Sequence, residues 1–223
     1  MTVADQILTF YKKLKSPVGL PEGVAVMNPF QNPDVFSLCE QFYNRFYSDT
    51  QPRKIIMGIN PGRLGGGMTG IPFTDPIKLE KNCGIANSLS KKAELSADFI
   101  YSMIESFGGT HQFYGKFLFS SVCPLGFTKN GINMNYYDDK SLEKQLKEFI
   151  ISSIRAQLRF SVDSEICFCM GEGQNYNYLS RLNSEYSFFK KIIPLPHPRF
   201  IMQYRRKKLP EFIDLYVQKL NKS

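Results

Sequence analysis

The sequence predicts an α/β protein, a three-layer α/β/α sandwich built around a mainly parallel sheet of four strands, in one domain over residues 1–223. Two observations lead to this prediction. Almost wholly apolar runs, typical of strands covered on both faces, occur at 54–59, 117–122, 166–170 and 191–195. Helical patterns separate these runs, and strands that alternate with helices pair in parallel through right-handed crossovers.

Each expected helix carries apolar residues three and four positions apart, which places them on one face. The pattern covers 5–15, 36–46, 97–107 and 142–160, and a final helix is expected over the basic residues 204–223. A chain of 223 residues buries roughly 70% of the surface that its unfolded form exposes, which is enough for one such domain.

The composition excludes a disordered chain and favours an anionic partner. Hydrophobic residues make up 43% of the chain, aromatic residues make up 14%, and the formal net charge is +8. A basic excess favours binding to nucleic acid or to a membrane surface. No apolar run approaches the ~20 residues of a membrane span, and the N-terminal residues contain no run of signal-peptide length, so we expect a cytoplasmic protein.

The five cysteines indicate neither a disulfide framework nor a metal site. Their number is odd, they lie within or beside apolar runs, and no Cys-x-x-Cys pair occurs. Cys167 and Cys169 alternate with Phe168 in a predicted strand, which places both thiols on one face as small core residues. We therefore expect no structural zinc or iron–sulfur centre.

Segment 58–76 is rich in glycine and follows the first predicted strand. Gly65, Gly67 and Gly70 formally match a dinucleotide-binding fingerprint, but they lie several residues beyond the strand, and Pro72 follows where a helix should begin. A nucleotide-binding enzyme and a plain surface loop with tight turns therefore stay open as alternatives for this segment.

The four predicted strands all end in unusual loops. These loops read Asn-Pro-Gly at 60–62, Cys-Pro-Leu-Gly at 123–126, Gly-Glu-Gly at 171–173 and Pro-His-Pro-Arg at 196–199. In open α/β sheets, ligands bind where the strands end and the loops begin. We expect the four loops to share one rim and to form a site.

Two pieces of the glycine-rich segment resemble the first motif of the single-strand-selective monofunctional uracil-DNA glycosylase family. They are Gly-Ile-Asn-Pro-Gly at 58–62 and Thr-Gly-Ile-Pro-Phe at 69–73. The Cys-Pro-Leu turn at 123–125 and the His197-Pro198 pair stand where that family has its middle motif and its second catalytic motif. The resemblance implies a monofunctional DNA glycosylase that hydrolyses the bond between a deaminated base and deoxyribose, without a metal or organic cofactor.

Breaking an N-glycosidic bond produces an oxocarbenium-like sugar and a departing base that carries negative charge. The resemblance assigns Asn60 to the sugar, because a carboxamide oxygen can orient a water toward it. It assigns His197 to the base, since a rigid loop between two prolines can aim an imidazole N–H at a base oxygen. The alternatives are an Asn60 that caps the following turn and a His197 that is a buried structural residue.

The same resemblance implies a pocket that stacks the extruded base on Phe73 and binds its edge through backbone groups of the first loop. The residues expected to bind the base are Gly58, Ile59, Gly62, Met68, Phe73 and Ser121. Ser121 stands where the family has an asparagine that binds the pyrimidine edge. A hydroxyl is shorter and rotates, so xanthine and hypoxanthine become candidate bases beside uracil.

Residues 198–202, Pro-Arg-Phe-Ile-Met, depart from the family pattern after its histidine. Arg199, Phe200 and Met202 are the candidates to fill the space that an extruded base leaves in DNA. Phosphate contacts are expected from Arg63, Arg205, Arg206, Lys207 and Lys208. The alternative for the charge run is a solvated helix face.

The protein is therefore predicted to be a monofunctional glycosylase that acts on DNA containing a deaminated base. We expect it to act as a monomer and not to bind a membrane. The alternative is a non-catalytic nucleic-acid-binding protein that keeps the fold and the basic rim. Ser121 permits that alternative, whereas the presence of both Asn60 and His197 opposes it. Neither motif contains a well-placed lysine, which argues against a Schiff-base lyase step.

Overall fold

The computed structural model describes residues 1–222 and contains the predicted central sheet. Its four strands lie in the order β3-β2-β6-β7 and all neighbours pair in parallel. Their bounds are β2 Arg53–Gly58, β3 Phe117–Ser121, β6 Val162–Met170 and β7 Lys191–Leu195. Apolar side chains point to both faces of these strands because helices cover both faces, and the predicted fold class is confirmed.

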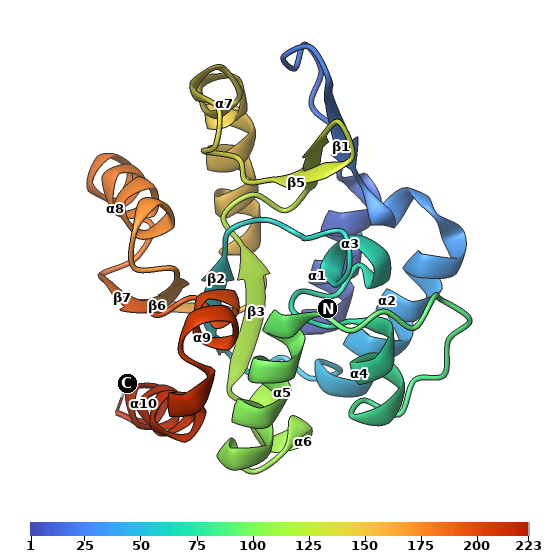
Figure 1. The fold of residues 1–223 in the computed structure, drawn as a ribbon, viewed down its shortest axis with the longest axis vertical. Coiled ribbons are helices and arrows are strands. Elements are labelled where there is room, and N and C mark those ends of the chain that lie inside the picture. Colours follow the sequence, from blue (N-terminus) through green and yellow to red (C-terminus); the bar gives the residue numbers. More distant parts are fainter. Residues whose placement is uncertain (223) are drawn as a thin grey trace.

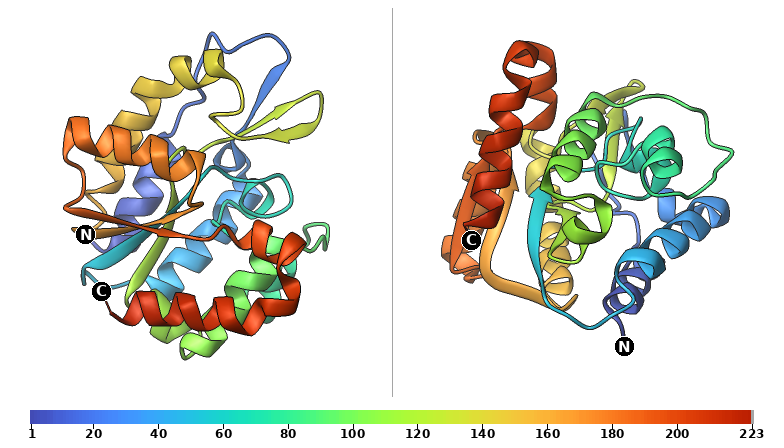
Figure 2. Two further views of the ribbon diagram at one scale, coloured as in Figure 1. Left: turned by 60° about the vertical axis from the view of Figure 1, so that its left-hand side comes forward. Right: turned by 90° about the horizontal axis from the view of Figure 1, so that it is seen from below.

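Helices form a layer on each side of this sheet (Figures 1 and 2). In the left view of Figure 2, α7 and α8 lie above the sheet, and α5 and α10 lie below it. The main helices are α1 Val3–Lys13, α2 Pro33–Phe46, α5 Leu95–Phe107, α7 Lys140–Gln157, α8 Gln174–Tyr186 and α10 Leu209–Asn221. No helix within residues 1–222 is long and apolar enough to cross a membrane.

Side-chain caps fix where several helices begin. Thr2 and Asp5 form a reciprocal capping box at α1, and Asp139 accepts hydrogen bonds from two backbone N–H groups at the start of α7. Asn32 caps α2, whose first residue is Pro33. Proline suits this position because the first helical residue has no intrahelical partner for its N–H.

The C-terminal part differs from the single helix predicted over 204–223. Helix α9 covers Pro198–Tyr204, a 3-10 turn, η2, covers Arg206–Lys208, and α10 begins only at Leu209. Pro210 lies in the first turn of α10, and a proline within an unbroken helix would remove a hydrogen bond and clash with the preceding turn. Ser223, the last residue of the predicted helix, lies outside the described residues.

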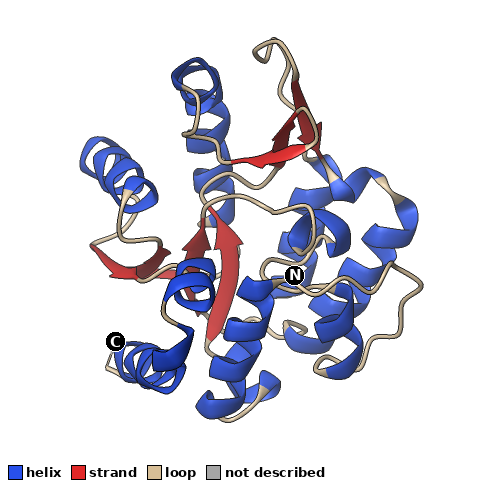
Figure 3. Ribbon diagram, in the orientation of Figure 1, coloured by secondary structure: helices blue, strands red, loops and turns tan. Residues whose placement is uncertain are grey.

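A second, smaller sheet was not predicted (Figure 3). It is antiparallel, in the order β1-β4-β5, with β1 Val24–Met27, β4 Gly126–Lys129 and β5 Ile132–Met134. Asn130 and Gly131 join β4 to β5 with φ values of 52° and 74°, and an Asn-Gly pair is a favoured hairpin turn because both positions require positive φ. This hairpin brings residues 133–135 to the ends of the parallel strands.

The remaining short elements connect these parts. They are η1 Pro29–Gln31, α3 Gly66–Thr69, α4 Pro76–Lys81 and α6 Thr110–Tyr114. The five cysteines are all buried free thiols.

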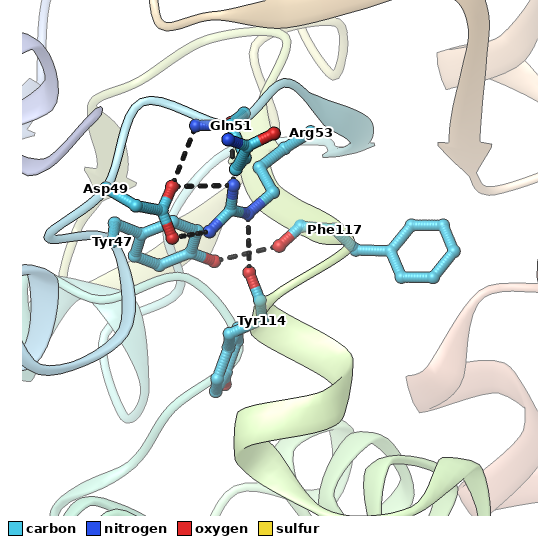
Figure 4. Close-up of polar contacts among 6 residues, drawn as sticks. All are labelled: Tyr47, Asp49, Gln51, Arg53, Tyr114 and Phe117. Atoms are coloured by element: carbon cyan, nitrogen blue, oxygen red, sulfur yellow. Dashed lines mark hydrogen bonds and ion pairs between the residues drawn. The ribbon is translucent and has the colours of Figure 1, made fainter. Parts of the chain in front are cut away.

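The first residue of β2, Arg53, is a buried cation with its charge paired (Figure 4). Its two terminal nitrogens donate to the two carboxylate oxygens of Asp49 at 2.9 and 2.8 Å, and its Nε donates to the Tyr114 carbonyl at 2.8 Å. This hydrogen bonding lowers the pKa of the Asp49 carboxyl. Bidentate pairing of this kind compensates for burial of the guanidinium, so the start of β2 is held firmly to the loop before it and to α6.

Candidate active site

A pocket of about 310 Å³ lies where β2, β3 and β7 end. The first and fourth predicted loops line it together, through Asn60 and His197, and the end of β3 contributes Ser121. Cys123 and Leu125 of the second loop are buried instead. The third loop, at 171–173, lines a neighbouring hollow in which His197 also takes part.

Asn60 follows β2, and backbone groups at the end of β5 and just after it orient its side chain. Oδ1 accepts a hydrogen bond from the Tyr136 N–H at 3.0 Å, and Nδ2 donates to the Met134 carbonyl at 3.2 Å. A longer contact, 3.4 Å, joins Nδ2 to the Pro61 carbonyl in the following turn. A carboxamide oxygen has two lone pairs, so Oδ1 can accept a hydrogen bond from a water in the pocket while it holds Tyr136.

His197 immediately precedes α9 and caps that helix. Its Nδ1 accepts a hydrogen bond from the Arg199 N–H at 3.1 Å, which places the proton of the neutral ring on Nε2. Burial lowers the pKa of His197 to about 4, and the charge of Arg199 acts in the same direction. At neutral pH the ring is therefore uncharged and offers one N–H donor to the pocket.

Phe73 lines the pocket with an unusual backbone conformation, φ 56°, and its ring packs on Phe119 with ring centres 5.3 Å apart. The ring lies over Gly58, because a Cβ added to Gly58 would come within 2.6 Å of Phe73 Cζ. Gly58 therefore does not form part of the pocket wall, where the sequence placed it. It makes room for the Phe73 ring.

The other residues predicted to bind the base divide into two groups. Ile59, Gly62 and Ser121 line the pocket, and Gln157 Nε2 donates to the Ser121 carbonyl at 3.2 Å. Met68 lies half-buried in α3, outside the pocket wall.

Two of the residues predicted to contact DNA line the pocket, and most of the others are exposed. Arg199 and Phe200 line it, and the Arg205 guanidinium lies 5.4 Å from the centre of the Phe200 ring. The side chains of 206–208 are exposed. Met202 is buried, since it points from α9 into the core, and so it is unavailable as a wedge between bases.

Arg63 follows the lining residue Gly62 and contacts the β4–β5 hairpin. Its Nη1 donates to the Gly131 carbonyl at 3.2 Å, and its backbone N–H donates to Asn133 Oδ1 at the same distance. Arg63 is exposed, and these contacts attach the first loop to the β4–β5 hairpin.

Several lining residues were not predicted: Glu94, Ser96, Asn133, Met134, Asn135, Gln203 and Tyr204. The Asn-Gly turn at 130–131 could have indicated the hairpin that carries three of them. No feature of the local sequence indicates that Glu94 lines the pocket. Within residues 1–222, no cluster of three or more His, Cys, Asp or Glu side chains is placed to hold a metal ion.

Comparison with known proteins identifies the family. The family model described as the Uracil DNA glycosylase superfamily matches residues 45–221. The chain belongs to the uracil-DNA glycosylase superfamily. Among solved structures, that of wild-type Pedobacter heparinus SMUG2 is similar, with 47% sequence identity, 100% of each chain covered and a TM-score of 0.96. Comparison with curated proteins finds no match.

These findings confirm the resemblance to the single-strand-selective family and show that the chain is a DNA glycosylase of base excision repair. The glycosylase carries Asn60, His197 and Phe73 around one pocket, as the motifs of its sequence suggested.

Gly58→Ala is expected to slow base excision by this glycosylase by as much as about a hundredfold. The added methyl group would collide with the Phe73 ring. If the base stacks on that ring, as the sequence predicts, a small displacement of the ring would misalign the base. The single-turnover excision rate measures the effect, and thermal unfolding reports the stability.

A matched control is the double variant Gly58→Ala/Phe73→Ala. If Gly58 acts through Phe73, the double variant is no slower than Phe73→Ala alone. A further loss in the double variant would contradict this explanation.

Proposed function

We propose that this glycosylase hydrolyses the N-glycosidic bond of uracil or another deaminated base in DNA and leaves an abasic site. One observation carries the proposal: a neutral imidazole with its free N–H on Nε2 shares a pocket with a carboxamide that can hold a water. These are the two groups that a departing anion and an electron-deficient sugar require.

The steps follow from these positions. The target nucleotide turns out of the stack and its base lies against Phe73. The bond between the anomeric carbon and the base breaks, and the electron pair leaves with the base. The His197 N–H donates a hydrogen bond to the base oxygen on which the charge develops. The water oriented by Asn60 adds its oxygen to the anomeric carbon and loses a proton to solvent, which gives the abasic sugar and the free base.

A lyase step would need an amine that forms a Schiff base with the opened sugar. The lining residues of the pocket, taken from the described part of the chain, include no lysine. This supports a monofunctional enzyme that leaves the strand intact.

Ser121 bears on the choice of base. Its side chain lies at the pocket wall at the end of β3, 6% exposed. A hydroxyl can rotate to donate or to accept, whereas an amide presents a donor and an acceptor in a fixed arrangement. We propose that the pocket therefore accepts xanthine and hypoxanthine in addition to uracil.

Phe200 is the proposed wedge residue, because it is 44% exposed and lies at the pocket mouth. Phosphate contacts are proposed for Arg199, for the exposed cations of 205–208 that follow α9 in the chain, and for the exposed Arg63. The protein is proposed to act on DNA as a monomer.

Single-turnover excision on short oligonucleotides tests this function. The substrates carry uracil, 5-hydroxymethyluracil, xanthine or hypoxanthine, in single-stranded and double-stranded form. We expect excision of uracil and of at least one purine, with strand cleavage only after alkali. Cleavage without alkali would contradict the monofunctional assignment. Absence of excision on every substrate, with DNA binding retained, would favour a non-catalytic binding protein.

Replacement of Arg205 and Arg206 by glutamine is expected to weaken DNA binding for all sequences alike. The logarithm of the DNA-binding constant falls linearly with the logarithm of the salt concentration. Loss of one phosphate contact makes this slope shallower by about 0.9, so loss of both makes it shallower by up to about 2. Binding titrations at several salt concentrations measure the slope. Lys12→Gln/Lys13→Gln in α1 removes the same charge from exposed positions outside this pocket and serves as the control. Equal slopes for the two double variants would show that 205–206 face away from DNA.

A further inference from the structure

A carboxyl group that the proposed mechanism does not use lies in the wall of the pocket. Glu94 immediately precedes α5, at the position where side chains usually cap a helix, but its side chain makes no capping hydrogen bond. Its backbone N–H donates to Asp75 Oδ2 at 2.9 Å, and the carboxyl turns into the pocket wall instead. Its Oε2 is buried and has no hydrogen-bond partner among residues 1–222.

Two glycines of the first loop make room for this carboxyl. A Cβ on Gly65 would collide with Glu94 Oε2, and a Cβ on Gly62 would lie 3.3 Å from Oε1. The Glu94 side chain is therefore inserted against the loop that begins with Asn60, two residues before Gly62. The loop has the glycines that this insertion requires, which ties Glu94 to the catalytic loop by packing.

The charged groups around Glu94 act in opposite directions. Burial raises the pKa of its carboxyl to about 7, the carboxylate of Asp75 at the start of α4 adds to this rise, and Arg199 of α9 opposes it. On α5 itself, Asp98 is paired with Lys78 of α4 at 2.8 Å. Across the loop, the Arg63 guanidinium donates to the Gly131 carbonyl. Glu94 therefore changes charge near neutral pH.

The histidine that lines the pocket does not change charge near neutral pH. The pKa of His197 is lowered to about 4, so its imidazole is already neutral at pH 6. Arginine stays protonated throughout the range in which proteins are stable. Among residues 1–222, Glu94 is the only acidic residue that lines the pocket.

We propose that Glu94 controls the rate of base excision through its charge: the neutral carboxyl permits the base to leave as an anion, and the carboxylate opposes it. This inference rests on the proposed function. Like charges that share a pocket shielded from water repel more strongly than they do in bulk solvent. The carboxylate therefore raises the energy of the state in which the base carries negative charge. A protonated carboxyl adds no such cost.

The test is the single-turnover rate of uracil excision between pH 5.5 and 9, for the unmodified protein and for Glu94→Gln. We expect the unmodified protein to lose about tenfold or more in rate from pH 6 to pH 9, with a midpoint near 7. Glutamine is neutral at every pH and has the same shape, so Glu94→Gln is expected to give a flat profile and to be the faster enzyme at pH 9.

Glu105→Gln is the matched control, because Glu105 lies on the same helix and is exposed. It is expected to retain the profile of the unmodified protein. Thermal unfolding at pH 8 checks the fold: Glu94→Gln is expected to be at least as stable as the unmodified protein, since a raised carboxyl pKa means that stability is lost as pH rises toward 7.

Three results would overturn this inference and leave the proposed function intact. They are a rate that rises with pH, a rate of the unmodified protein that does not depend on pH, and a rate of Glu94→Gln that still falls as pH rises. A rate that rises with pH would mean that the carboxylate acts on the positive sugar. Absence of excision by the unmodified protein at every pH would overturn the proposed function itself, and this inference with it.

Discussion

His197→Ala is expected to slow single-turnover excision by a factor of about 10² to 10³. In the proposed mechanism the neutral imidazole offers its Nε2 proton to the departing base, so alanine would leave that anion without a donor. This interaction strengthens only as the charge develops, so the affinity for intact DNA is expected to stay nearly unchanged. Excision kinetics and binding titrations on the same oligonucleotide separate the two effects.

The same substitution also removes the cap of α9, which costs about 1 kcal/mol of stability. His197→Ser is the control, because a serine oxygen can accept the Arg199 N–H but does not extend as far into the pocket. Both variants are expected to be slow, and only His197→Ala is expected to lose stability. A serine variant with nearly normal excision would show that His197 acts through the helix start alone.

Asn60→Ala is expected to reduce excision at least about a hundredfold, since in the proposed mechanism the attacking water would lose the group that orients it. It is also expected to lower the free energy of unfolding by about 1–3 kcal/mol, because the Tyr136 N–H and the Met134 carbonyl lose their partner. Excision rate, DNA affinity and thermal unfolding are measured together. A loss of affinity as large as the loss of rate would mean that Asn60 serves only to hold the hairpin segment.

The sequence was informative wherever burial dictates the residue type. The four parallel strands could be predicted from their apolar runs, which pack in the interior of the sandwich. The first half of β6, residues 162–165, was missed because it contains Asp163, Ser164 and Glu165 and is partly exposed. The strands β1, β4 and β5 have three or four residues each and are partly exposed, which leaves too short a pattern to recognise. The helix break before Leu209 depended on one proline within a basic segment.

The site could be predicted in part for the same kind of reason. Asn60 and His197 closely follow buried strands, and the loops that carry them contain prolines, so their place at the sheet edge follows from the chain. The contact between Gly58 and Phe73 depends on how the loop folds back over the strand. The burial of Met202 depends on how α9 packs on α5. Glu94 enters the pocket only because two glycines far from it in sequence leave room.

Helix α9 connects His197 to the exposed side chains that are proposed to meet DNA. A backbone N–H of its first turn donates to the imidazole of His197, and the same helix carries the exposed rings of Phe200 and Tyr204, whose centres are 5.6 Å apart. The imidazole proposed to donate to the base and the rings proposed to meet the DNA thus belong to one helix of seven residues and its cap. Under the proposed function, any displacement of α9 at these rings would also displace the backbone N–H that holds the His197 imidazole.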